Sequence, residues 1–157
     1  MKIQLLLSGK TRFPFIREGI EEYKRRLVHY TDFQIRELPD LKNSGSWPEK
    51  KIIEEEARII LKAIDNRDYL VLLDEGGMQM DSIAFARLLE KQQFGSFRTM
   101  FFVVGGPYGF AGEVYKRANF ELSLSNMTFS HQLVRLIFLE QLYRAYTIIR
   151  GEPYHHG

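Results

Sequence analysis

The sequence predicts a single α/β domain with a mostly parallel sheet and helices on both of its faces. Two observations indicate this fold: apolar segments of strand length alternate with segments of helical periodicity, and the connections between them are short. The length of 157 residues suits one hydrophobic core. Residues 1–157 are therefore expected to form one domain.

The first half of the chain is expected to hold two strands and two helices. Residues 2–8 form an apolar run of strand length, and Pro14 stands where the first turn of a helix to about residue 29 would begin. Residues 33–38 alternate apolar and polar side chains, as a half-exposed or edge strand does. Ser46 is expected to cap the second helix.

The second half begins with two strands that should be buried on both faces. Residues 69–74 and 99–104 are continuous apolar runs, which are typical of central strands in a parallel sheet. Asp81 is expected to cap the helix between them, and Gly95 to close it. A short helix and a strand should follow at residues 113–118 and 120–124.

The final helix, at about residues 131–149, has apolar side chains on every side. A helix without a polar face has to be buried all round. One side can cover the sheet, but a domain of this size offers no second layer to cover the other. We therefore expect a homodimer whose interface includes this helix.

Composition excludes several classes of protein. Without cysteine there is no disulfide framework, thiolate zinc site or cysteine nucleophile, and a reducing cytoplasm is the expected compartment. No apolar stretch approaches the roughly 20 residues of a membrane-spanning helix. The four histidines show no familiar metal-ligand spacing, so no catalytic metal is expected.

Charge alone leaves RNA binding undecided. The net charge is only +2, although basic residues crowd the segment 12–26 and acidic residues occupy 54–56. Such clusters are usually solvated helix faces, and they also occur on RNA-binding surfaces. Both interpretations remain open at this point.

Three loops that follow strands predict a small-ligand site. Residues 105–112, with the sequence GGPYGFAG, contain glycines that let a ligand approach the backbone closely. EGGMQM at 75–80 and SNMTFS at 125–130 follow two other strands. Because ligands usually bind at the carboxyl ends of parallel strands, the three loops are expected to form one pocket.

Familiar nucleotide and hydrolase motifs are not favoured. The dinucleotide fingerprint G-x-G-x-x-G follows the first strand of its unit, whereas these glycines follow the fourth expected strand with a different spacing. The segment 8–11 (SGKT) is similar to the end of a phosphate-binding loop, but Gln4 occupies the required first glycine position. No G-x-S-x-G nucleophile elbow is present.

The most specific motifs lie in the C-terminal third. LSNMTFSHQLVRLIFLEQLYRAYTIIRGEPYHH spans residues 124–156, and VVGGPYG precedes it at 103–109. With these motifs, its length and its start KIQLLLSGK, the whole chain resembles the ribosomal RNA large subunit methyltransferase H family of SPOUT enzymes.

The resemblance implies an α/β fold with a trefoil knot near the C-terminus, a homodimer, and S-adenosylmethionine bound at the knot. It also implies methyl transfer to N3 of a pseudouridine in 23S ribosomal RNA on the assembled ribosome. The residues expected to bind the cofactor are Leu73, Gly105, Gly106, Leu124, Ser125, Asn126, Met127, Thr128 and Phe129.

The tail, residues 151–157, is expected to carry the chemistry. Tyr154 can stack on a flipped pyrimidine, and His155 can accept the N3 proton or hydrogen-bond the carbonyl oxygen where charge develops. Arg144 is expected to hold substrate or orient the tail, with simple pairing to Glu140 as the alternative. From the residues alone, a nucleotide-dependent enzyme of another class and a non-catalytic RNA-binding module also remain open.

Overall fold

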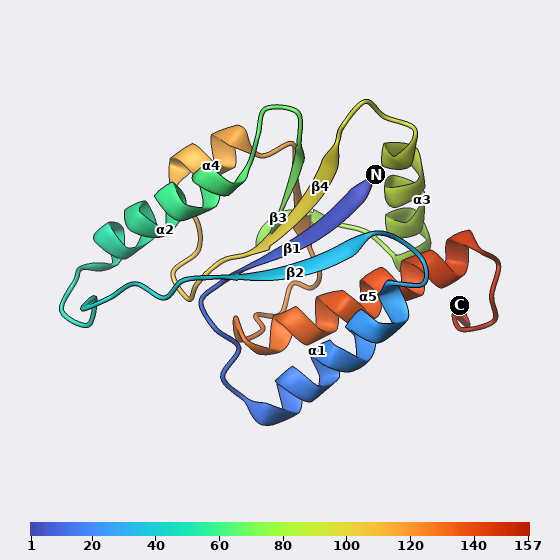
Figure 1. Ribbon diagram of the computed structural model, residues 1–157, viewed down its shortest axis with the longest axis horizontal. Coiled ribbons are helices and arrows are strands. Elements are labelled where there is room, and N and C mark those ends of the chain that lie inside the picture. The colour runs from blue at the N-terminus through green and yellow to red at the C-terminus, as the bar shows by residue number, and fades with distance from the viewer.

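The computed structural model describes residues 1–157, which form one parallel sheet between two layers of helices (Figure 1). The strand order is β2-β1-β4-β3-β5, and all four pairings are parallel. The strands are β1 (Lys2–Ser8), β2 (Phe33–Leu38), β3 (Tyr69–Gln79), β4 (Thr99–Val104) and β5 (Phe120–Ser123). The predicted parallel α/β architecture is confirmed, including the edge position of β2.

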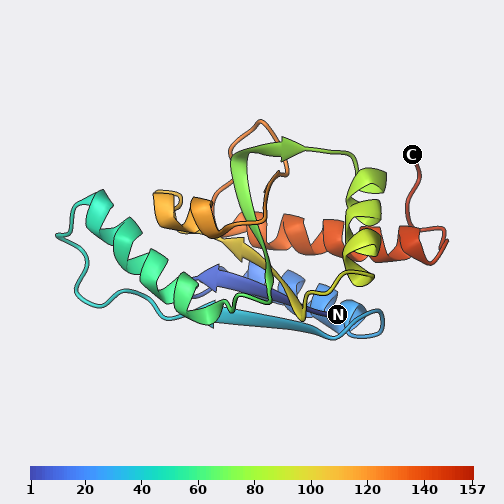
Figure 2. The same ribbon diagram turned by 90° about the horizontal axis from the view of Figure 1, so that it is seen from above.

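Helices cover both faces of the sheet, as Figure 2 shows from above. One layer contains α1 (Pro14–Leu27), α3 (Ser82–Gln93) and α5 (Leu133–Ile149). The opposite layer contains α2 (Glu49–Ala63) and α4 (Gly112–Arg117). None of these helices combines the length and the apolar character needed to cross a membrane.

Side chains of the central strands point alternately to the two faces of the sheet and so form two cores, one under each helix layer. In β1, Ile3, Leu5 and Leu7 belong to the core under α1, α3 and α5, whereas Leu6 belongs to the core under α2 and α4. Successive strand side chains point to opposite faces, so a strand covered on both sides needs apolar residues at every position. All six residues of β4 are buried, as its apolar run predicts.

Most helix ends lie within about two residues of the prediction, with one wrong cap. Asp81 caps α3 as expected, because its Oδ1 accepts a hydrogen bond from the Ala84 N–H at 2.7 Å. Ser46 does not cap α2, which begins at Glu49 with Pro48 in the N-cap position. The hydroxyl of Ser46 stands three residues before the helix, too early to serve its free N–H groups.

The main difference from the prediction concerns β3, which continues past residue 74 to Gln79. Leu73 and Met78 both pair with Leu122 of β5, so the residues between them form a bulge. A Cβ on Gly77 would lie 2.6 Å from the backbone of the adjacent strand. Glycine therefore permits the close approach, and the segment expected to be a loop is a bulged strand.

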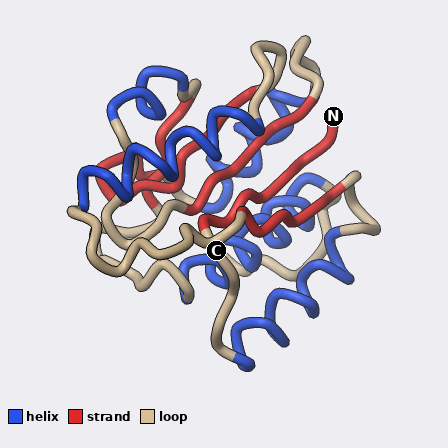
Figure 3. Tube along the Cα trace, turned by 60° about the vertical axis from the view of Figure 1, so that its left-hand side comes forward, coloured by secondary structure: helices blue, strands red, loops and turns tan.

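The environment of α5 corrects the argument made for a dimer. Figure 3 shows helices on both sides of the strands, and α5 packs against α1 and α3 as well as the sheet. Leu136 fills the space over Gly19 of α1, where a Cβ would lie 2.6 Å away. On the other side, Ser82 Oγ donates to Gln141 Oε1 at 2.8 Å. Flanking helices of the same chain thus cover sides of α5 that were expected to need a partner.

Candidate functional site

A cavity of about 350 Å³ opens at the carboxyl ends of β4 and β5 and at the bulge of β3. Its wall takes residues from all three loops named by the sequence, and we call it the strand-end cavity. Eight of the nine residues expected to bind the cofactor line it: Leu73, Gly105, Gly106, Leu124, Ser125, Met127, Thr128 and Phe129. Asn126 lies instead in a neighbouring depression, beside Met80 and Asp81.

Protein neighbours, as well as any ligand, constrain the two glycines of the wall. A Cβ on Gly105 would lie 3.0 Å from the ring of Phe110. A Cβ on Gly106 would lie 2.8 Å from both carboxyl oxygens of Glu56. Sequence reasoning attributed both glycines to ligand approach and so missed these two contacts.

The loop after β5 is held in place by short side-chain hydrogen bonds. Ser123 Oγ donates to the Ser125 carbonyl at 3.0 Å, and the Met127 N–H donates to Ser125 Oγ at 2.9 Å. Thr128 Oγ1 donates to Glu75 Oε2 at 2.6 Å, which joins this loop to the bulge of β3. The two segments therefore form one continuous wall.

The charge of the strand-end cavity is negative. Its wall contains Asp74 and Glu75 and no lysine or arginine. Asp74 Oδ2 accepts a hydrogen bond from Tyr115 at 3.0 Å, and burial together with this bond raises the pKa of Tyr115 to about 12. Burial, and next the neighbouring Arg135, lowers the pKa of His131, so this side chain is neutral at pH 7. The cavity thus favours a cationic ligand over an anionic one.

A buried arginine that sequence reasoning missed anchors the end of β1. Arg135 of α5 is fully buried and donates to the Gly9 carbonyl at 3.0 Å, the Ser8 carbonyl at 3.1 Å and Thr11 Oγ1 at 2.9 Å. Gly9 has a φ of +87°, which favours glycine without any phosphate ligand. The motif similar to a phosphate-binding loop thus supplies acceptors for Arg135. The signal in the sequence was a cation, Arg135, among the apolar residues of the first half of α5.

The three residues expected in catalysis form one cluster with Glu140 at the C-terminal end of α5. Arg144 Nε lies 3.0 Å from Glu140 Oε1, and Arg144 Nη1 lies 3.1 Å from His155 Nδ1. Tyr154 donates to Glu140 Oε1 at 3.1 Å, and the Arg144 guanidinium lies 4.8 Å from the centre of the Tyr154 ring. Arg144 therefore pairs with Glu140 and contacts both tail residues.

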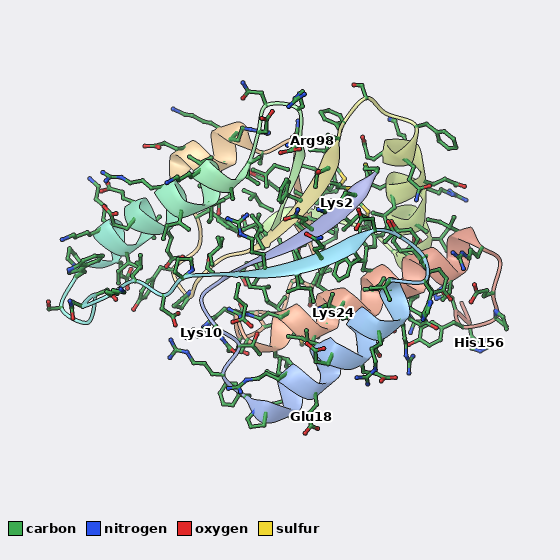
Figure 4. The ribbon with its side chains drawn as sticks, viewed as in Figure 1. Lys2, Lys10, Glu18, Lys24, Arg98 and His156 are labelled. Atoms are coloured by element: carbon green, nitrogen blue, oxygen red, sulfur yellow. The ribbon has the colours of Figure 1, made fainter.

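This tail cluster does not line the strand-end cavity of its own chain. His155 lines a neighbouring cavity, which shares Leu122 and Leu124 with the first. Figure 4 labels Lys10 near the start of α5 and His156 beyond its end. Since Gln132 Nε2 donates to the Lys10 carbonyl at 3.1 Å, the tail and the end of β1 lie at opposite ends of this helix.

Comparisons with known proteins agree along the whole chain. A protein-family profile described as "Predicted SPOUT methyltransferase" matches residues 1–155. Three similar proteins are each named ribosomal RNA large subunit methyltransferase H. The one from Parabacteroides distasonis is 51% identical over 156 residues, 99% of each chain. That from Christiangramia forsetii is 47% identical over 156 residues, 99% of each chain. That from Cytophaga hutchinsonii is 46% identical over 156 residues, 99% of this chain and 100% of the other.

Proposed function

The chain belongs to the ribosomal RNA large subunit methyltransferase H family of SPOUT methyltransferases, and we propose that it methylates N3 of a pseudouridine in 23S ribosomal RNA on the assembled ribosome. As a SPOUT methyltransferase it uses S-adenosylmethionine as the methyl donor. The observation that carries the proposal is the strand-end cavity, with its apolar wall and its acidic charge.

The residues of this cavity fit S-adenosylmethionine, which supplies a methyl group activated on a sulfonium. Leu73, Leu124 and other apolar side chains offer a slot for the adenine ring. The main-chain groups of Asn126, Thr128 and Phe129 take part in none of the hydrogen bonds of the protein, so they are available to a ligand. The nine residues expected from the sequence are the ones we propose to hold the cofactor.

Charge disfavours the nucleotide-dependent alternative. ATP and NAD would place phosphate groups near Asp74 and Glu75, where no lysine or arginine of the wall could neutralise them. A sulfonium carries a positive charge that the same two carboxylates attract.

In the tail cluster, the hydrogen-bond pattern supports a donor role for His155. A guanidinium only donates, so His155 Nδ1 accepts from Arg144 and the neutral ring carries its proton on Nε2. Because the tail lies at the far end of α5 from the end of β1, we propose that in a dimer this Nε2–H donates to a carbonyl oxygen of the base bound beside the strand-end cavity of the other subunit. This bond lowers the pKa of the N3–H and stabilises the negative charge that develops on the imide as the N3 proton passes to solvent water, while the methyl group leaves the sulfonium and bonds to N3.

Tyr154 is proposed to stack on the same base. Burial, followed by contacts with Tyr23 and Glu140, raises the pKa of Tyr154, so its hydroxyl stays protonated at neutral pH. The phenol is therefore a hydrogen-bond donor to Glu140 and not a base. Its ring is positioned by an edge-on contact with Tyr143, at 4.8 Å between centroids, and by the Arg144 guanidinium, 4.8 Å from its centre.

We further propose a homodimer, supported by exposed apolar side chains where α1 and α5 begin. Phe13, Phe15 and Leu133 are 49%, 63% and 37% exposed. The Arg12 N–H donates to Gln132 Oε1 at 2.8 Å, which brings the two segments together. A self-complementary contact at this surface would remove these side chains from water.

The trefoil knot of the family is also part of the proposal. β5 is an edge strand, separated from β1 by β3 and β4. The chain nevertheless returns from β5 to the end of β1, where Gln132 and Arg135 bond to Lys10 and Ser8. A crossing of this kind over the strand ends is what a knotted C-terminal segment requires.

The test is methyl transfer to ribosomes from a strain that lacks the gene, with the modified base mapped by mass spectrometry. We expect one N3-methylated pseudouridine in 23S RNA, and titration calorimetry that shows binding of S-adenosylmethionine but not of NAD or ATP. Binding of ribosomes without any methyl transfer would indicate an RNA-binding module instead. Heat of binding with ATP or NAD alone would indicate a nucleotide-dependent enzyme.

A further inference from the structure

A second cavity, of about 280 Å³, adjoins the strand-end cavity. The two share Gly106, Pro107 and His131, so an occupant of one lies beside an occupant of the other. We call it the Glu56 cavity, after the carboxyl group that α2 contributes to its wall. Its remaining wall comes from the ends of β1 and β2 and the segment that follows β2.

The wall contains two polar groups that the protein does not satisfy. Ser8 Oγ and Glu56 Oε2 are both buried and both without a hydrogen-bond partner. Buried polar atoms nearly always have partners, so each exception calls for an explanation. Both residues line the same cavity, so the two unpartnered oxygens belong to one wall.

The charge of the wall restricts the chemistry of an occupant. Burial raises the pKa of Glu56, and the Gly106 N–H offsets only part of that effect. Asp40 adds a second carboxyl group, which Arg12 contacts at 3.8 Å. A phosphate inside the cavity would therefore meet carboxyl groups, whereas a neutral group with its own N–H and carbonyl would satisfy both oxygens.

At the cavity wall, side chains typical of RNA recognition are exposed. Tyr108 is 45% exposed and offers a ring on which a base can stack. The side chain of Arg12 is 71% exposed and can reach a backbone phosphate from outside. This combination suits an unpaired nucleotide whose base enters and whose phosphate stays at the surface.

We propose that the Glu56 cavity binds a neutral, unpaired nucleobase of the RNA substrate, with Glu56 and Ser8 as its hydrogen-bond partners. The inference rests on the proposed methyl transfer to ribosomal RNA. The base is either the reacting pseudouridine or a neighbour in the strand that presents a ring N–H and a carbonyl group of the same kind. The kinetics of methyl transfer distinguish these two candidate bases.

The test compares Glu56→Met with Glu54→Met, an exposed position on the same helix. Methionine keeps the length of the side chain and removes its hydrogen-bonding oxygens. For Glu56→Met we expect the dissociation constant of S-adenosylmethionine to stay within about 2-fold and kcat/KM for ribosomes to fall about 10-fold or more, the scale of one lost hydrogen bond to a buried group. A fall in kcat assigns the reacting base to the cavity, and a rise in KM alone assigns its neighbour.

If Glu56→Met weakens S-adenosylmethionine binding by the same factor as it lowers kcat/KM, the Glu56 cavity is part of the cofactor site, and the proposal is overturned. Unchanged kinetics with unchanged cofactor affinity would leave a water-filled cavity and overturn it as well. If Glu56→Met does not fold, Ser8→Ala carries the same measurements, because it removes an oxygen that has no partner. Wild-type protein that transfers no methyl group would instead overturn the proposed function, and this inference with it.

Discussion

Tyr30 donates a hydrogen bond to Glu152 Oε2 at 2.7 Å, and so ties the start of the tail to the turn after α1. Arg150 strengthens this tie, since its guanidinium lies 4.2 Å from the centre of the Tyr30 ring and donates to the His29 carbonyl at 2.9 Å. Glu152 stands two residues before Tyr154. The direction of the tail is therefore set by contacts outside α5.

Replacing Tyr30 with phenylalanine should lower kcat for ribosomes by about 10-fold, the effect of one lost hydrogen bond to a carboxylate. Cofactor affinity and KM should not change, because Tyr30 lines neither the strand-end cavity nor the Glu56 cavity. Tyr69→Phe is the matched control, since Tyr69 lies in β3 and contacts Phe97 instead of the tail. If Tyr30→Phe and Tyr69→Phe have the same kcat, Tyr30 does not position the tail.

Gly105→Val should abolish binding of S-adenosylmethionine, with a loss of about 100-fold or more for a side chain that fills part of the site. The Phe110 ring, 3.0 Å from the added Cβ, has to move as well, so a lower melting temperature should accompany the loss. Gly45→Val, where a Cβ meets nothing within 4 Å, is the control. A folded Gly105→Val protein with normal affinity in calorimetry would refute this placement of the cofactor.

Truncation after Gly151 should leave cofactor binding intact and reduce methyl transfer by about 100-fold or more, the scale of a lost hydrogen-bond donor to a developing anion. His156→Ala tests the exposed end of the tail alone and should retain activity, since no hydrogen bond holds its side chain. Single-turnover methylation of ribosomes measures both variants. Most of the activity surviving truncation would mean that the tail is not catalytic.

Glu56→Gln should stabilise the folded protein more at about pH 8 than at about pH 4. The pKa of Glu56 is raised above its ordinary 4.5 by burial, so the folded state loses stability as the pH rises through the unfolded and then the folded pKa. Glutamine has no charge to bury and escapes this loss. Melting temperatures at the two pH values, with Glu54→Gln as control, check the sign. A larger gain at the acidic pH would contradict it.

Arg135→Met should destabilise the protein by about 3 kcal/mol, because it leaves the carbonyls of Ser8 and Gly9 without their donor at about 1–3 kcal/mol each. Arg87→Met, at an exposed position of α3, should change stability by less than about 0.5 kcal/mol. Denaturant unfolding gives both values. Equal midpoints for the two variants would show that Arg135 is not a structural anchor.

Local patterns in the sequence predict the parts of the fold that depend on them. The run at 99–104 is apolar at every position because β4 is central and covered on both faces, so the strand is predicted to the residue. The second half of β3 could not be predicted in this way. Two acidic residues followed by two glycines at 74–77 are typical of a turn, and only pairing with β5, more than 40 residues later, keeps this segment extended.

In the candidate site too, features set by local patterns were predictable, and features set by contacts between distant parts of the chain were not. The loops of the strand-end cavity were predictable because ends of parallel strands meet at one edge of the sheet. Glu56 was not, since it belongs to the acidic run 54–56, which is typical of a solvated helix face. Only the packing of α2 against the turn at Gly106 distinguishes the third carboxyl from the first two.

The anchoring of β1 by Arg135 also determines when the chain can finish folding during its synthesis. The hydrogen bonds from Arg135 join residues that are 124 to 127 positions apart in the chain. In addition, β1 lacks one of its two neighbouring strands until β4 has been synthesised. At a synthesis rate of about 5–20 residues per second, Arg135 is added several seconds or more after the end of β1, whose acceptors have no Arg135 donor until then. A nascent chain released before residue 135 leaves the ribosome would expose those carbonyls, and native structure is therefore acquired only after nearly the whole polypeptide has emerged.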